Sequence, residues 1–484
     1  MIFNRATYIN NNFFSDNTIV LLGYLLLLPI YICLNNTSFT LVIPIVFIPI
    51  IYVVLFVLSF KFVAHISTPG LVVVNALYFL RYYILPISTI TYMPNSYIKE
   101  FVSGTWLLLY EEIFLSIVLY LYLKKEKHSE FVRINDENFN KEFKIILLLF
   151  SVFCLACAFF YILDPSVYNS FNLITNIGND FVELIENQAR ETESSSFRTL
   201  EVIVIYLTYL MFAICIVLFF YSKYRKKNSN TYFFLALVVP LIASSIIIID
   251  TDRGGIVHRG AAILFFLFRL FPEKRKTLIN TTYIPMGGLV LYLIVSRMFD
   301  SEKDGSSVIS AEEFFVYYMQ GYLAGVQNCT ESIQTYIHYN SSVDLATLFN
   351  DLFYNVPIIS HFTTENACSI YFSKEIGFDD QVLPLVGNGL MYFGYFLSPA
   401  LLILTIKIVL IADRKYRYET NILGVYVFSY ISIQLSFCHY QNIQLIMLYL
   451  TCRILPIWLI YKFVKHFSTT IKYKKNESYI MQNM

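Results

Sequence analysis

Charged residues are scarce in this chain of 484 residues. Aspartate, glutamate, lysine and arginine supply 14% of the sequence, whereas hydrophobic residues supply 57% and aromatic residues 18%. Polar linkers of the kind that separate soluble domains are missing too, and apolar runs of about 18 to 22 residues recur along most of the length. The composition therefore excludes a soluble protein and predicts a chain that has the lipid bilayer as its solvent.

The sequence also lacks the motifs of soluble catalytic domains. It has no Walker loop, no His-Glu-x-x-His zinc motif, no Gly-x-Ser-x-Gly nucleophile turn and no nucleotide-binding domain. Cys154 and Cys157 have the spacing of a redox or metal pair, but they lie in an apolar run without a histidine or carboxylate nearby, and we interpret them as packing residues. We accordingly expect no metal, no cofactor and no nucleic-acid partner.

The apolar runs predict an all-α, polytopic membrane fold with about twelve transmembrane helices. They lie near residues 18–34, 39–60, 70–90, 103–123, 145–163, 201–222, 232–249, 256–272, 279–297, 384–410, 421–438 and 443–463. No small-residue cleavage site follows the first run, so we expect it to stay as an anchor. No repeat of fixed period is visible, which gives no support to a transporter built from two similar halves. We treat 1–484 as a single transmembrane domain.

Basic residues set the expected orientation. They concentrate in the tail after the last run and in every second connection, at 124–144, 223–227, 274–276 and 414–417. By the positive-inside rule these connections face the cytoplasm together with both termini. The connections 164–200 and 298–383 then face outward. Cys329 and Cys368 lie in the second of these loops, where an oxidising compartment permits a disulfide.

The large outward loop, 298–383, carries helix signals. Ser310 with Glu313 forms a capping-box pattern ahead of a run of aromatic residues, which predicts a helix that starts there. Ser342 or Asp344 could cap a second helix with leucine and phenylalanine on one face. Such amphipathic helices would lie along the outer membrane surface. They would either roof a lipid-accessible cavity or only stabilise the bundle.

Four ionisable residues fall inside expected spans. Arg81 lies in the third span, Glu111 and Glu112 lie at a similar depth in the fourth, and Arg453 lies midway along the twelfth. Because an unpaired charge in the bilayer costs several kcal/mol, we expect Arg81 to pair with Glu111 or Glu112, and Arg453 is a second cation that one of these carboxylates could neutralise. The four residues either fix helix register or form part of a polar cavity that binds substrate.

The richest polar stretch is 250–260, at an outward turn between two spans. It contains Arg253, His258 and Arg259 together with several glycines, and Arg198 and Arg297 flank neighbouring spans on the same side. Arginine presents a planar fork that matches phosphate oxygens, so this group of arginines predicts a site for an anionic ligand such as a diphosphate. The alternative is mutual neutralisation with nearby carboxylates, namely those of Asp250, Asp252, Glu201 and Asp300.

Two short motifs resemble the family of O-antigen and capsular polysaccharide polymerases, the Wzy family. The segment 251–255, Thr-Asp-Arg-Gly-Gly, is similar to the Arg-Gly turn of those proteins, and the segment 381–394 resembles their pattern of proline, glycine and aromatic-glycine where the large loop enters a span. The resemblance in topology extends over the whole chain, whereas the resemblance in sequence motifs is limited to about 25 residues. Asn388 stands where an acidic residue would be expected, which leaves the base at that place open.

The resemblance implies a fold of the GT-C-like membrane type and a glycosyltransferase activity. The substrates would be oligosaccharide repeat units linked to undecaprenyl diphosphate, joined into O-antigen or capsule at the outer face of the inner membrane. A hydroxyl group of one unit would attack the anomeric carbon of the growing chain, and the lipid diphosphate would leave without the help of a metal. Membrane lipid, a flippase and a separate chain-length regulator are the implied partners.

The residues expected to act in such a site fall into two groups. Cationic groups would stabilise the leaving diphosphate, with Arg253 and Arg259 foremost and Arg198 next. The general base for the acceptor hydroxyl could be His258, His361, Asp379 or Asp380. Substrate binding is expected of Arg198, Arg297, Arg81, Glu111, Glu112 and Arg453.

Three other functions compete with this one. A lipid-linked oligosaccharide flippase or other transporter shares the number of spans and a cationic cavity, but does not need so long a loop on one face. An O-antigen ligase shares topology and leaving group and differs in its acceptor. A membrane acyltransferase would need a deep catalytic histidine, whereas the seven histidines here lie in loops or near the ends of spans.

Overall fold

The computed structural model describes residues 16–36, 39–63, 68–125, 131–132, 134, 139–163, 171–173, 196–249, 253–281, 311–354, 356, 359, 367–376 and 382–482. Six helices in this part of the chain are long and apolar enough to cross a membrane, or seven if one bent pair counts as a single span. Three shorter apolar helices accompany them, at Leu21–Asn35, Val42–Leu58 and Asn230–Ala243. The expected all-α membrane class is confirmed, while the number of twelve spans stays a prediction.

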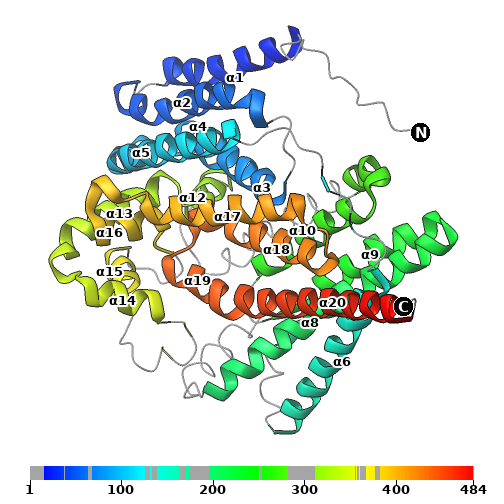
Figure 1. Cartoon of the computed structure of the whole chain (residues 1–484). Coiled ribbons are helices and arrows are strands. Elements are labelled where there is room, and N and C mark those ends of the chain that lie inside the picture. The colour runs from blue at the N-terminus through cyan, green and yellow to red at the C-terminus, as the bar shows by residue number, and fades with distance from the viewer. Residues whose placement is uncertain are drawn as a thin grey trace.

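The N-terminal helices form a layered block along one side of the bundle (Figure 1). In it α1 packs on α2, and α2 packs on α5. Helix α3, the π-helix η1 and α4 together make one span, Pro69–Tyr92. The bounds are α1 Asp16–Asn35, α2 Phe39–Val63, α3 Pro69–Tyr78, η1 Phe79–Ile84, α4 Leu85–Tyr92 and α5 Asn95–Lys125.

The central and C-terminal helices surround α18, which is buried along its whole length. Helices α17, α10 and α3 pack against it. Two three-residue strands, β1 and β2, pair antiparallel beside α9. The bounds are α6 Phe139–Leu163, β1 Phe171–Leu173, α8 Ser196–Lys227, α9 Asn230–Ile246, β2 Ile247–Ile249, α10 Arg253–Leu270, η4 Pro272–Lys274, α17 Ala400–Tyr418, α18 Ile422–Ser436, η8 Cys438–Tyr440, α19 Ile443–Leu448, η9 Tyr449–Ile454 and α20 Leu455–Gln482.

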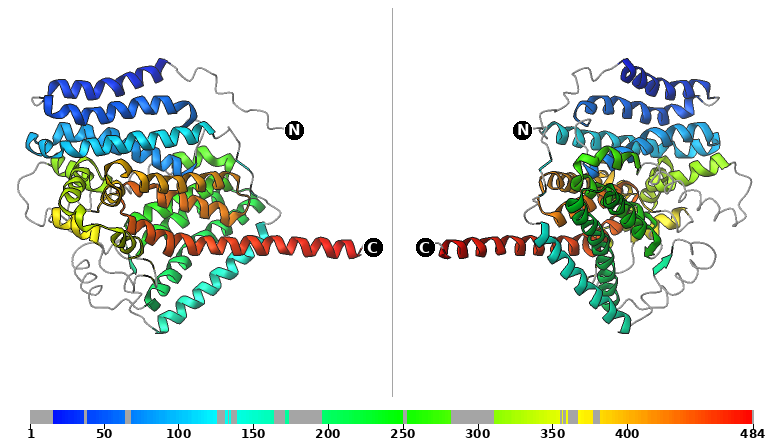
Figure 2. Two further views of the ribbon diagram at one scale, coloured as in Figure 1. Left: turned by 60° about the vertical axis from the view of Figure 1, so that its left-hand side comes forward. Right: turned by 90° about the vertical axis from the view of Figure 1, so that its right-hand side faces the viewer.

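The described part of the large loop gathers at one end of the bundle, which we call the hairpin end (Figure 1). Its elements are α12 Ala311–Leu323, α13 Val326–Tyr339, η6 Asn340–Ser342, α14 Leu345–Phe353, α15 Ala367–Ile376 and the following helix α16 Leu385–Leu397. At the opposite end, which we call the basic end, α5, α8 and α17 finish with lysine or arginine in the last turn. In both views of Figure 2 the C-terminal part of α20 projects beyond the bundle at the basic end.

The span expected over 384–410 is not a single straight helix. Helices α16 and α17 meet at 108°. Gly394 has φ of +73°, a conformation that favours glycine, and Pro399 precedes the first residue of α17. Helix α17 alone continues toward the basic end, and α16 stays at the hairpin end (Figure 1).

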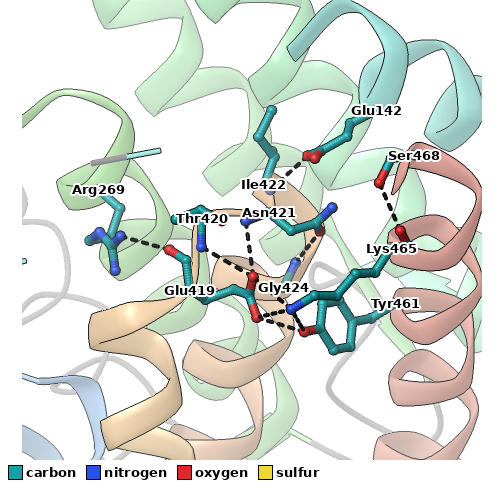
Figure 3. A network of polar contacts seen from close by, with 10 residues as sticks. All are labelled: Glu142, Arg269, Glu419, Thr420, Asn421, Ile422, Gly424, Tyr461, Lys465 and Ser468. Carbon is teal, nitrogen blue, oxygen red and sulfur yellow. Dashed lines mark hydrogen bonds and ion pairs between the residues drawn. The ribbon is translucent and has the colours of Figure 1, made fainter. Parts of the chain in front are cut away.

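Hydrogen bonds at the basic end satisfy the ends of several helices at once (Figure 3). Arg269 of α10 donates to the backbone oxygens of Tyr416, Arg417 (3.3 Å), Val132 (2.5 Å) and Glu419 (3.0 Å). The last carbonyl groups of a helix have no hydrogen-bond partner within the helix. The hydrogen bonds that Arg269 donates to such groups therefore offset the free-energy cost of burying its charge. This arginine therefore has a structural role.

Glu419 completes the same network between α17 and α18. Its carboxylate accepts from the Tyr461 hydroxyl at 2.6 Å, from the backbone nitrogen of Asn421 at 3.0 Å and from Lys465 at 3.2 Å. Burial raises the pKa of Glu419, but the hydrogen bonds from Tyr461 and Asn421 and the charge of Lys465 outweigh it, so the pKa lies below its ordinary value. The connection from α17 to α18 is thus held by an ionised carboxylate.

Candidate functional site

The structure describes some of the predicted site residues with their side chains, some as backbone only, and others not at all. Side chains are described for Arg81, Glu111, Glu112, His258, Arg259, Arg453 and Glu201. Arg198 and Arg253 are described only as backbone, in the first turns of α8 and α10. The remaining predicted residues lie outside the described part of the chain: Asp250, Asp252, Arg297, Asp300, His361, Asp379 and Asp380.

Arg81 pairs with Glu111, as the sequence predicted. Its Nη1 and Nη2 atoms lie 2.7 Å and 2.8 Å from the two carboxylate oxygens, a bidentate geometry between side chains that are each 1% exposed. His439 joins the pair, with its Nδ1 3.0 Å from Nη1 of Arg81. An arginine can only donate, so Nδ1 accepts and the ring proton is on Nε2. His439, which comes from η8, was not among the predicted site residues.

The fourth contact of Arg81 is with the large loop 298–383. Its Nε atom donates to the backbone oxygen of Ala324 at 3.1 Å. Ala324 has φ of +48° and, with Gly325, forms the tight turn between α12 and α13. Arg81 therefore holds the tip of a helical hairpin as well as the register of two spans.

Hydrogen bonds along both arms show that this hairpin, α12–α13, descends into the bundle. Gln320 on α12 donates to Thr89 at 2.6 Å. Ala324, four residues later, contacts Arg81, which lies deeper than Thr89 in the span Pro69–Tyr92. On the returning arm, Thr330 donates to Phe101 at 3.0 Å. The hairpin thus enters from the hairpin end and turns back at the depth of the Arg81–Glu111 pair.

Close contact between backbones fixes the returning arm. A Cβ atom added to Gly104 of α5 would lie 2.2 Å from the backbone oxygen of Val326 and 2.4 Å from the backbone nitrogen of Thr330. Only glycine allows this approach. The sequence did not predict α13, because most of its residues are polar, although Val326, Cys329 and Ile333 lie on one buried face. Its polar atoms bind α5 and α12.

Two helix starts that the sequence predicted in this loop are present. Helix α12 begins at Ala311, directly after Ser310. Helix α14 is capped by Asp344, whose carboxylate accepts from the backbone nitrogen of Thr347 at 2.8 Å. Leu345 and Phe349 of α14 are exposed, and the location of this helix at the membrane surface stays a prediction.

Cys329 and Cys368 are both free and buried. They belong to two different clusters of the core, so the disulfide that their shared loop permitted is not formed in this structure.

Both intramembrane arginines lie in π-helical turns. Arg81 is in η1 and Arg453 is in η9, and each turn closes with a hydrogen bond that spans five residues. Each turn is followed by Leu-Pro, at Pro86 and at Pro456. Proline has no N–H to donate and its ring displaces the carbonyl four residues earlier, which favours the wider turn. The repeated Ile-Leu-Pro-Ile (84–87 and 454–457) is a sequence signal for these turns.

A second polar cluster lies between α8, α10 and α18. Arg259 of α10 is 2% exposed, and its Cζ atom lies 5.1 Å from the ring centre of Tyr209. Its Nε and Nη2 atoms have no hydrogen-bond partner among the described residues. In contrast to Arg269 on the same helix, Arg259 is a buried cation with unused donors.

Tyrosines extend this cluster toward Arg453. The Arg453 guanidinium lies between the rings of Tyr449 (4.5 Å) and Tyr206 (4.9 Å). The hydroxyl groups of Tyr206 and Tyr430 are 2.5 Å apart. Glu111 pairs with Arg81, and the two ring contacts contribute to the stability of the Arg453 cation.

His258 faces α18. Its Nδ1 lies 3.2 Å from Oε1 of Gln434, and its ring is 4.2 Å from that of Phe437. With the amide oriented in this way, Nδ1 donates and Nε2 is the basic nitrogen. Because Phe437 and His439 are two residues apart, the two polar clusters meet where α18 ends, in the half of the bundle nearer the hairpin end.

Asp351 is a further buried carboxylate that the sequence missed. It accepts from the Tyr392 hydroxyl and, at 3.4 Å, from Gln444, which joins α14, α16 and α19. Asn388, where an acidic residue was expected, accepts from the backbone nitrogen of Ile443 at 2.9 Å and so caps α19. In the described part of the chain no group of three or more histidine, cysteine, aspartate or glutamate residues could hold a metal ion.

Comparisons of the chain with protein-family models, with curated proteins and with solved structures find no significant match.

Exchanging the two charges tests the role of Arg81. We expect Arg81→Glu and Glu111→Arg each to lower the free energy of unfolding by about 3 kcal/mol or more, because each leaves two like charges buried together. The double variant should recover part of the loss, measured by thermal unfolding in detergent. It should not recover the protection of α12–α13 from proteolysis, because a glutamate at position 81 cannot donate to Ala324. Full recovery of both would contradict the role of Arg81 at the hairpin tip.

Glu331 makes the hairpin sensitive to pH. It lies on α13 one turn from Gln327, which donates to it at 2.9 Å, and its Oε2 has no hydrogen-bond partner among the described residues. Burial raises the pKa of Glu331 from 4.5 to about 7, although the hydrogen bond from Gln327 lowers it. The folded protein therefore binds this proton more tightly than the unfolded chain.

We expect the stability of the hairpin to fall as the pH rises from 4.5 to about 7, since the stabilising proton is lost over that range. Glu331→Gln should remove this part of the pH dependence, and Glu313→Gln on α12 is the control. Hydrogen exchange of α12–α13 across the range is the measurement. An unchanged pH profile in Glu331→Gln would contradict the assignment.

Proposed function

We propose that this protein is a membrane glycosyltransferase that polymerises lipid-diphosphate-linked oligosaccharide repeat units into a surface polysaccharide. The observation that carries the proposal is Arg259, a buried arginine with two unused donor atoms. A buried cation costs free energy unless an anion binds next to it, so we expect this site to bind an anionic ligand. A diphosphate fits a planar donor fork that stays charged when water is excluded.

The surroundings of Arg259 support a diphosphate that leaves during a reaction. Arg253 and Arg198 begin α10 and α8, the two helices that flank Arg259 and its tyrosine, so both backbones lie at the same end of the bundle. His258, with its basic Nε2, is adjacent in sequence and is the described candidate for a general base. The proposed orientation places the hairpin end, and with it this half of α10, in the periplasm of the bacterial inner membrane.

The reaction is a displacement at the anomeric carbon. A hydroxyl group of the acceptor unit loses its proton to His258 and its oxygen bonds to the anomeric carbon of the donor. The bond from that carbon to the diphosphate oxygen breaks with its electron pair, and the charge that grows on the diphosphate is stabilised by Arg259, with Arg253 as its proposed partner. Undecaprenyl diphosphate is the proposed lipid, and a flippase and a chain-length regulator are the proposed partners.

Two arginines on α10 provide a matched test. Arg259→Lys should keep normal accumulation in the membrane but lower polymerising activity by about 100-fold or more, because the fork is lost. Arg269→Lys should instead lower the midpoint of thermal unfolding, because backbone carbonyls lose their donors. Arg259→Met should unfold at a higher temperature than the native protein, since it removes an uncompensated buried charge. If Arg259→Lys keeps full activity, the anion site is elsewhere.

The surface polysaccharide of cells distinguishes polymerase from its rivals. Arg253→Ala should leave lipid that carries at most one repeat unit in place of a ladder of lengths, while the protein accumulates normally; Arg253→Lys should be intermediate. A full ladder in Arg253→Ala would exclude this residue from the site. If deletion of the protein removes even the single-unit band, a flippase or an O-antigen ligase is the better assignment and the polymerase proposal fails.

A further inference from the structure

Glu112 is a buried carboxyl group for which the described residues offer no partner. It is fully buried, and neither Oε1 nor Oε2 accepts a hydrogen bond within the described part of the chain. Its neighbour Glu111, by contrast, accepts hydrogen bonds from both terminal nitrogens of Arg81. The two glutamates are consecutive on α5, so their side chains point about 100° apart and cannot share the same donors.

The charges around Glu112 do not balance if it is ionised. The groups that face it are Tyr52 from α2, Tyr78 from α3, Tyr82 from η1 and Glu111 on its own helix. Arg81 is the cation nearest to them, and both of its terminal nitrogens are already bound to Glu111. His439 accepts from Arg81 and is therefore uncharged. One cation thus faces two carboxyl groups, and it neutralises one.

A small cavity lies one helical turn from Glu112 along α5. It has a volume of about 30 Å³ and is lined by Tyr52, Asn75, Tyr78 and Ser116, with apolar residues as far as Leu123 near the basic end. Ser116 is one helical turn from Glu112 on the same face of α5. A space of this size holds about two water molecules. Water in this cavity would lie about one helical turn from Glu112.

We propose that Glu112 is a proton-binding site inside the membrane domain, neutral in the state described here and able to exchange its proton with water in the cavity between α2, α3 and α5. Exchange breaks the O–H bond of the carboxyl group and transfers the proton to water, leaving a carboxylate. That carboxylate places a second negative charge beside Glu111, the partner of Arg81. The site is independent of the proposed glycosyl transfer.

Carbodiimide labelling tests this site directly, since dicyclohexylcarbodiimide reacts with protonated carboxyl groups in apolar surroundings. The full-length protein in detergent should be modified at Glu112 and not at Glu111, as mapped by mass spectrometry, and the modification should fall as the pH is raised. Glu112→Gln should lose this label, and Glu419→Gln at the basic end should keep it. Absence of label at Glu112 across the pH range, or protection of Glu112 by sodium ions, would overturn the proton as its ligand.

Thermal unfolding of two neighbouring variants gives a second, independent measurement. Glutamine has the shape of a protonated glutamate, so Glu112→Gln should unfold at the native temperature or above it. Glu111→Gln leaves Arg81 without its carboxylate and should unfold at a lower temperature. Equal destabilisation by both variants would show that Glu112 is ionised in the folded protein, and the proposal would be wrong.

Discussion

The guanidinium group of Arg81 is the contact on which the arrangement of the polar half of this molecule depends. It binds Glu111 of α5, His439 of η8 and the backbone of Ala324 at the hairpin tip, and all of these groups are buried. A bilayer offers no water to replace a lost donor, so each of the three segments is held at one depth. The place of η8 in turn fixes where α18 ends, and with it the position of Phe437 against His258.

Buried charged residues in this bundle differ in how fully their polar atoms are hydrogen-bonded. At the basic end, Arg269 and Glu419 have several partners each, and their hydrogen bonds satisfy helix ends (Figure 3). Elsewhere in the bundle, Arg259 on α10 and Glu112 near the middle of α5 are buried with unused polar atoms among the described residues. Neither charge is explained by the stability of the fold, because a buried charge with unused polar atoms costs free energy. Their retention favours ligand binding at the first and proton exchange at the second.

Sequence patterns predicted the elements whose signals are local. The capped start of α14 at Asp344 and the start of α12 were correct, because capping depends on residues three or four positions apart. The pairing of Arg81 with a glutamate at the same depth was correct as well, because burial in lipid leaves a charge few alternatives. Helix α13 was missed, since most of its residues are polar and its apolar face, with Val326, Cys329 and Ile333, is narrow. The bend between α16 and α17 was missed because one glycine with positive φ is not visible in a hydropathy pattern.

The sequence by itself determined that this is a helical membrane protein, that its basic residues gather at one end, and which ionisable residues lie within its spans. Only the tertiary structure decided which of those residues are satisfied. In the folded protein Arg81 pairs with Glu111 and not with Glu112, and the Arg453 guanidinium contacts the rings of Tyr206 and Tyr449. His439 contacts Arg81 although the two residues are 358 positions apart in the sequence. The physical reason is that hydrophobicity and charge are properties of single residues, whereas the satisfaction of a buried polar atom depends on donors and acceptors that distant helices bring to it.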